Sequence, residues 1–180
     1  ALPGTYQVQL TVGETILTQS FEVVNDPRST VSRSDLAEQL ALLQRIHDKI
    51  SEAHEAIIRL RSVRTQLAGW RTRLSDQTEI LDLIDGLGRK LDAVEDELIL
   101  PGEQKDTFGL NERIRLNAAL CSVISVIASA DARPTVQAGE LAKEYFAQVD
   151  VQIEVLENAL ATDLPRLNSM IERAVPPIVA

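Results

Sequence analysis

The sequence predicts a mainly α-helical protein: an antiparallel four-helix bundle with long helices, preceded by an N-terminal β-hairpin. Three observations indicate this fold class. Through most of residues 34–175 apolar side chains recur every three or four positions, the spacing of one buried helical face. Aromatic residues make up only 3% of the chain, which favours an aliphatic helical core. Residues 1–27 instead alternate apolar and polar side chains, as β-strands do.

The hairpin is expected over residues 1–27, followed by a polar linker at 28–33. The turn is placed at Gly13-Glu14 because glycine tolerates the positive φ of a tight hairpin turn. The opening residues, Leu2 to Tyr6, are similar to the approach to a late strand of an immunoglobulin-like sandwich. The resemblance implies that the hairpin is the remnant of such a sandwich, so we expect further strands elsewhere in a longer polypeptide. The apolar positions of the two strands are Tyr6, Val8, Leu10, Val12, Leu17, Phe21 and Val23.

The first helix is expected over residues 34–74, capped by Ser32 or Ser34. A helix of roughly 40 residues would be about 60 Å long and needs partners of similar length to bury its apolar face. Gly69-Trp70 is the place where a bend or a stop is expected, and the sequence leaves one rod or two pieces open. The apolar face is formed by Leu36, Leu43, Ile46, Ile50, Ala53, Ile57, Leu60, Leu67 and Leu74.

Three further helices are expected at about 76–99, 111–130 and 135–175. Asp76 and Glu79 have the spacing of a capping box at the start of the second helix. The third helix has apolar or small side chains nearly all the way round, which predicts contacts with several neighbours and a buried Cys121. Pro165 is expected to kink or restart the fourth helix because proline removes a backbone donor.

Charge predicts how the first two helices pair. Residues 56–74 hold five arginines and no acid, whereas residues 76–97 hold eight acids against Arg89 and Lys90. A short connection makes the two helices antiparallel neighbours, so the basic end of one lies beside the acidic start of the other. We therefore interpret the arginines as a register device rather than a phosphate-binding patch.

Composition excludes several classes of function. A formal net charge of −9 argues against nucleic acid or an anionic membrane as the main partner, and the longest helical run without charge, residues 116–130, is too short to span a bilayer. A single cysteine excludes an internal disulfide. Phosphate-binding loops and nucleophile elbows are absent from the sequence, so we predict no enzyme activity and no cofactor for this chain.

Two groups of residues are candidates for a site. His47 and His54 lie seven residues apart, so two helical turns separate them by about 10 Å. This spacing favours interhelical hydrogen bonding over a shared metal, with a metal- or ligand-sensing bundle as the alternative. Trp70, with Arg71 and Arg73, is the candidate for a protein contact, or else it covers an end of the bundle.

Several short motifs resemble the C-terminal region of large bacterial sortilin-like proteins with neuraminidase-type (BNR) repeats, often labelled glycosyl hydrolases. The motifs are residues 2–12, Thr18-Gln19, Val23-Val24, residues 26–28, 115–117, 129–135 and 162–168. The resemblance implies a non-catalytic C-terminal accessory module of a larger exported protein, periplasmic or extracellular, that contacts its own propeller domain or another subunit. A homo-oligomer stays open, and so does a glycosidase whose active site lies in the propeller.

Overall fold

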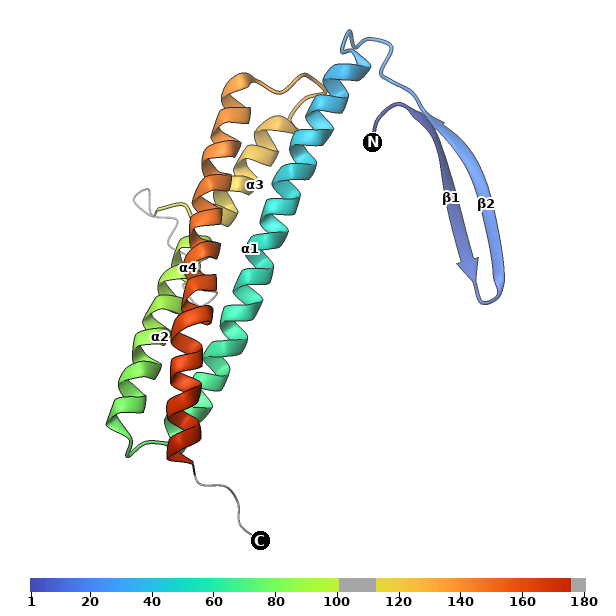
Figure 1. The fold of residues 1–180 in the computed structure, drawn as a ribbon. Coiled ribbons are helices and arrows are strands. Elements are labelled where there is room, and N and C mark those ends of the chain that lie inside the picture. Colours follow the sequence, from blue (N-terminus) through green and yellow to red (C-terminus); the bar gives the residue numbers. More distant parts are fainter. Residues whose placement is uncertain (101–112, 176–180) are drawn as a thin grey trace.

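The computed structural model describes residues 1–100 and 113–175, in which a β-hairpin precedes four helices (Figure 1). The strands are β1 (Gly4–Val12) and β2 (Thr15–Val23). The helices are α1 (Arg33–Arg73), α2 (Thr78–Leu98), α3 (Leu116–Ile127) and α4 (Val136–Ala174). This order of elements confirms the predicted mainly α-helical class, with four helices after a β-hairpin, whereas the origin of the hairpin in an immunoglobulin-like sandwich stays a prediction.

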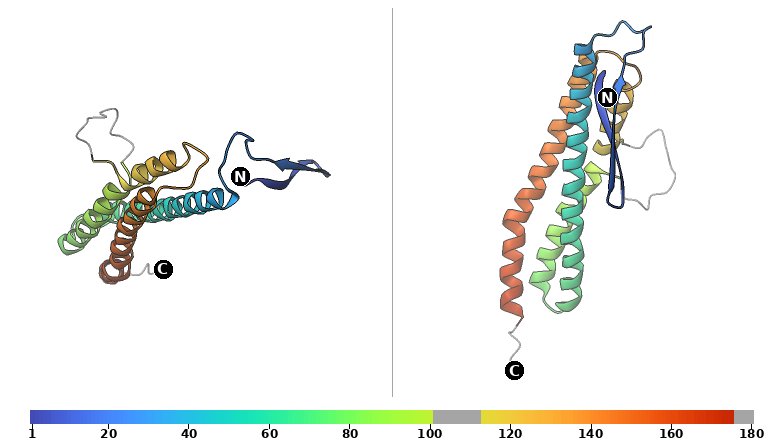
Figure 2. Two further views of the ribbon diagram at one scale, coloured as in Figure 1. Left: turned by 90° about the horizontal axis from the view of Figure 1, so that it is seen from above. Right: turned by 90° about the vertical axis from the view of Figure 1, so that its right-hand side faces the viewer.

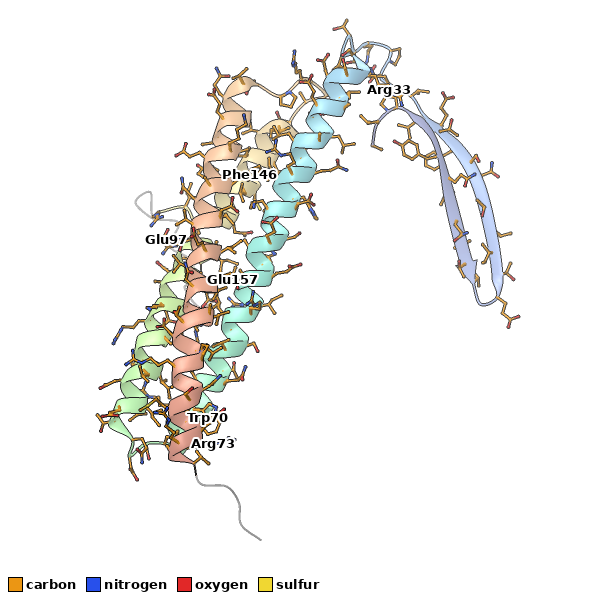
Figure 3. All side chains as sticks on the ribbon, in the orientation of Figure 1. Arg33, Trp70, Arg73, Glu97, Phe146 and Glu157 are labelled. Atoms are coloured by element: carbon orange, nitrogen blue, oxygen red, sulfur yellow. The ribbon has the colours of Figure 1, made fainter. Side chains whose placement is uncertain are left out.

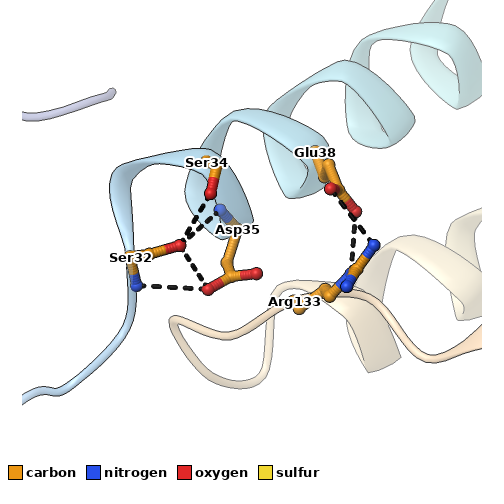
Figure 4. Close-up of polar contacts among 5 residues, drawn as sticks. All are labelled: Ser32, Ser34, Asp35, Glu38 and Arg133. Carbon is orange, nitrogen blue, oxygen red and sulfur yellow. Dashed lines mark hydrogen bonds and ion pairs between the residues drawn. The ribbon is translucent and has the colours of Figure 1, made fainter.

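The helix α1 is one unbroken rod of 41 residues. It begins at a capping box, in which the Ser32 hydroxyl accepts from the Asp35 backbone N–H and the Asp35 carboxylate accepts from the Ser32 backbone N–H (Figure 4). The bend or stop expected at Gly69-Trp70 was wrong, because α1 continues to Arg73. One glycine lowers helix propensity by only about 1 kcal/mol, and burial of Leu67 and half-burial of Trp70 against the bundle hold this last turn.

The four helices do not run side by side over their full length. The rods α1 and α4 are parallel, because their ion pairs advance together along both chains, from Lys49 with Asp150 to Arg59 with Glu157. The shorter helices α2 and α3 follow one another along the same side of these rods, and both run antiparallel to them (Figures 1 and 2). At 1.5 Å per residue they measure about 30 and 18 Å, so together they cover about four-fifths of the roughly 60 Å of α1.

The core is aliphatic and lies on the axis of the bundle. All four helices contribute to one cluster of buried side chains, as the three-and-four spacing predicts. Burial in this cluster is the main stabilising term, because an isolated helix without such a face is marginal in water. The largest fully buried side chains are Ile46, Leu60, Leu87, Leu91, Leu98, Leu120, Leu156, Leu167, Val94 and Val149.

Two helix starts differ from the predictions. The helix α2 begins at Thr78 after Gln77, whose side chain makes no cap hydrogen bond, so the Asp76–Glu79 capping box was wrong. The helix α3 begins at Leu116, and Arg113 to Arg115 precede it without helical structure. Residues 111–112, also assigned to the third helix, lie outside the described residues.

A side chain of α1 caps the C-terminal end of α3. The buried side chain of Gln39 donates from Nε2 to the Ile127 and Ala130 carbonyls, at 2.7 Å each. The Ile127 carbonyl lies at the helix end, where carbonyls lack an intrahelical donor, and the Ala130 carbonyl lies in the connection after it, so one side-chain amide serves both. The expected end at residue 130 was therefore too late, and Ile127 is the last helical residue.

The helix α4 runs through Pro165 without a break, so the expected restart there was wrong. Pro165 cannot donate to the carbonyl of Ala161, four residues earlier. Both residues are exposed, so water can hydrogen-bond that carbonyl and the loss is small. The proline therefore costs far less here than it would on the buried face.

Candidate interaction surfaces

The hairpin has one apolar face, and it lacks cover in the structure. Residues directly opposite each other in the register share a face, and the register pairs Tyr6 with Phe21, Val8 with Gln19, Leu10 with Leu17, and Val12 with Thr15. Within the described residues the only element that either strand contacts is the other strand. The hairpin stands away from the bundle (Figures 1 and 2). Hereafter the hairpin apolar face means Tyr6, Val8, Leu10, Val12, Leu17 and Phe21.

Most side chains of this face are exposed to solvent. Its Val and Leu side chains are 54–65% exposed, and Phe21 is 48% exposed. Contiguous apolar patches of this kind mark interaction sites in soluble proteins, and a two-stranded hairpin alone is marginally stable in water. The hairpin apolar face is therefore the strongest candidate for a protein contact.

The opposite face of the hairpin is polar. Thr5, Gln7, Gln9 and Thr11 lie opposite Glu22, Ser20, Thr18 and Ile16. Alternation thus separates the two faces, apart from Ile16 on the polar face and Gln19 and Thr15 on the apolar one. Such separation is typical of a sheet with one side packed and one side in solvent.

The base of the hairpin is locally ordered. Tyr6 Oη donates to the Leu2 carbonyl oxygen at 2.6 Å, and the Tyr6 ring stacks on Phe21 with 5.9 Å between centroids. Gly13 has φ 59° at the two-residue turn, the positive value that primed hairpin turns require. Both ends of β1 are therefore fixed by specific geometry, and its apolar side chains stay on one face.

The predicted contact residues at the end of α1 are used within the bundle. Arg71 forms an ion pair with Asp85 of α2. Trp70 is half-buried against the core, and the Arg73 guanidinium lies over its ring, 5.2 Å from the centroid (Figure 3). These contacts favour the interpretation that Trp70 covers the end of the bundle.

Arg61, Arg64 and Arg71 of α1 pair with acids of α2, as the charge pattern predicts, whereas Arg59 pairs with Glu157 of α4. Arg61 Nε lies 2.6 Å from Glu95, and Arg64 pairs with both Glu95 and Asp92. Glu95 is buried, with 4% of its surface exposed. Burial alone would raise the pKa of Glu95, but the hydrogen bonds from Arg61 and Arg64 outweigh it and lower the pKa below its ordinary value. Glu95 directly follows Val94 and lies on the apolar face of α2. An acid on an apolar face is the sequence signal by which this buried ion pair could have been predicted.

The two histidines do not meet. The imidazole of His54 hydrogen-bonds to Asn117 of α3, with 2.9 Å between Nε2 and Oδ1, which is the interhelical role predicted. The nearest acid to His47 is Asp48, at 3.8 Å. Residues 1–100 and 113–175 contain no group of three or more His, Cys, Asp or Glu side chains placed to hold a metal ion.

The prediction that Cys121 is buried was wrong, because its side chain is exposed on α3. The buried face of this short helix is formed by Leu116, Leu120, Val123 and Ile127, which places Cys121 outside. We expect the thiol of the native protein to react with a maleimide in minutes, with one label per chain and no need for denaturant. Labelling that requires unfolding would contradict this placement.

A second apolar area lies between α3 and α4. Ile114 and Val126 are about two-thirds exposed, at 66% and 65%, and with Leu141 and Tyr145 they line a groove of about 310 Å³. Scattered exposed apolar residues are normal in soluble proteins. Among the described residues, the hairpin apolar face alone forms an apolar surface that continues across two paired strands.

A scan against protein-family models and searches of curated proteins and of solved structures give no match to this chain. The resemblance to sortilin-like proteins therefore stays a prediction. No helix among the described residues is both long enough and apolar enough to cross a membrane.

Proposed function

We propose that this chain is a non-catalytic interaction module: a helical rod that attaches to other protein through the hairpin apolar face. The exposed apolar face of an ordered hairpin carries the proposal. The contact is intramolecular, with another domain of a larger exported polypeptide, as the sortilin-like resemblance implies. In that setting the protein is periplasmic or extracellular.

Two features support a docking role over a catalytic one. Several charged side chains form ion pairs between elements, such as Lys90 of α2 with Asp163 of α4, and Arg133 of the connection before α4 with Glu38 of α1 (Figure 4). The long axis of α1 and α4 separates the hairpin from the far end of the bundle (Figure 1). A rod with one attachment point near one end is suited to hold domains apart or to bring them together.

Hydrogen exchange of the full gene product tests this proposal. We expect hairpin amides to exchange about tenfold or more slowly there than in residues 1–180 alone, because docking protects the strands. The double variant Leu10→Thr with Leu17→Thr removes apolar side chains from one cross-strand pair and should abolish the difference. The matched control, Gln7→Thr with Ser20→Thr, changes the opposite face and should preserve it.

Two results would overturn the proposal. One is equal exchange of the hairpin in the full gene product and in residues 1–180. The other is protection that survives the Leu10→Thr and Leu17→Thr pair, since docking would then not use the apolar face. Exchange of the α1 and α4 amides serves as an internal standard, because their burial is set within the bundle.

A further inference from the structure

We infer that β1 and β2 are the last two strands of a β-sandwich, in which the open edge of β1 pairs with a further strand and a second sheet covers the hairpin apolar face. This inference rests on the proposed function and names its partner as a β-sheet with an alternating apolar face. It also assigns the two edges of the hairpin different roles: β1 becomes an internal strand and β2 stays at the edge.

The contact between Tyr6 and Leu2 points to a sandwich. In immunoglobulin-like domains a tyrosine near the start of the penultimate strand donates from its hydroxyl to a backbone carbonyl a few residues upstream, where the chain crosses between sheets. Tyr6 is the third residue of β1, and its hydroxyl donates to the carbonyl four residues earlier. The same geometry makes β1 the penultimate strand and β2 the last strand.

The charges distinguish the two edges. Edge strands of soluble proteins carry charged side chains that prevent unwanted pairing. The strand β1 has no charged residue, whereas β2 contains Glu22, and Glu14 lies in the turn just before β2. The edge of β1 therefore lacks the protection that a solvent-facing edge needs.

The backbone of β1 has free groups for another strand. The residues that flank a two-residue turn, here Val12 and Thr15, exchange both hydrogen bonds, and the pairing alternates from there along the ladder. The N–H and C=O groups that face away from β2 therefore belong to Thr5, Gln7, Gln9 and Thr11. Strand addition uses such a row of groups.

The size of the apolar face argues against a second copy of this chain as the occupant. Nine residues at about 3.4 Å, over two strands about 4.8 Å apart, give a face of roughly 300 Å². A stable interface between separate proteins buries about 800 Å² on each partner. Strands linked to the hairpin by the chain itself need far less area, because the link raises their effective concentration.

Proline substitutions at one rung of the hairpin test the edge assignment in the full gene product. Gln9 and Thr18 lie opposite each other, both side chains are exposed, and each has its N–H on an open edge. Proline removes that N–H and is tolerated only where no strand pairs with it. We expect Gln9→Pro to abolish the roughly tenfold protection of the hairpin and Thr18→Pro to retain it.

The unaltered protein gives a second measurement that does not depend on how well a variant folds. The amides of Gln7 and Gln9 should exchange about tenfold or more slowly than those of Ser20 and Thr18. Equal effects of the two proline variants, or equal exchange at the two edges, would overturn the strand assignment. Docking of the apolar face would still stand in that case if the Leu10→Thr and Leu17→Thr pair removed protection, so the two proposals fail separately.

Discussion

Replacing Leu60 by alanine is expected to lower the free energy of unfolding by about 3 kcal/mol, within the range of about 2–5 kcal/mol for buried leucines. The Leu60 side chain is 0% exposed and belongs to the cluster that all four helices form. Alanine leaves a cavity that surrounding helices fill only in part. For a domain of this size the melting temperature should fall by about 10 °C, measured by circular dichroism at 222 nm.

The control is Ile58→Ala, two residues away on the same helix. Ile58 is 69% exposed, so its truncation removes little buried area, and alanine favours helix more than isoleucine does. We expect a change of less than about 0.5 kcal/mol. Similar losses for the two variants would show that the α1 face assigned to the core is wrong.

The parts of the fold that follow from local periodicity were predictable. Leu87, Leu91, Val94 and Leu98 repeat by four and three, and all four are buried. The hairpin register follows from Gly13, whose positive φ fixes the turn and hence the face of every residue on both strands. Opposite charge on successive segments likewise predicted the pairing of α1 with α2, now seen between Arg71 and Asp85.

The errors occurred where tertiary contacts outweigh local preference. Gly69 and Pro165 both disfavour helix locally, yet both lie inside helices here, because the buried turns around them supply far more stability than the local loss. Cys121 shows the converse. A helix with small and apolar residues on every side does not reveal which side faces solvent, and the positions of α1 and α4 decide it.

The sequence predicts only part of the candidate interaction surface on the hairpin. Alternation on the two strands gave the hairpin apolar face, but exposure of that face depends on which elements lie nearby, and a sequence pattern cannot show this. Trp70 was the candidate anchor because tryptophan is frequent in binding hot spots. Its burial against the bundle and its contact with Arg73 are long-range properties.

Replacing Glu95 by glutamine is expected to destabilise the bundle by about 1–3 kcal/mol. The buried carboxylate accepts from both Arg61 and Arg64, and losing its charge leaves two guanidinium groups without their main partner. Breaking a fully buried pair costs about 3–5 kcal/mol, but the Arg61 and Arg64 side chains are 51% and 38% exposed, so solvent reduces the loss. Urea unfolding at pH 7 measures this loss in the free energy of unfolding.

The pH dependence of the difference in free energy of unfolding between the wild type and Glu95→Gln identifies the Glu95 carboxylate as the source of that difference. The pKa of Glu95 is lowered in the folded protein, so its contribution is fully present above the unfolded pKa of about 4.3 and is lost as pH falls through the folded pKa. The difference in free energy of unfolding between the wild type and Glu95→Gln should therefore be constant from pH 7 to about pH 5 and become smaller below about pH 4.

Asp92→Asn is the matched control for Glu95→Gln, since Asp92 also pairs with Arg64 but its side chain is 64% exposed. It should cost less than about 1 kcal/mol, and an equal cost for both variants would mean that burial of Glu95 adds nothing.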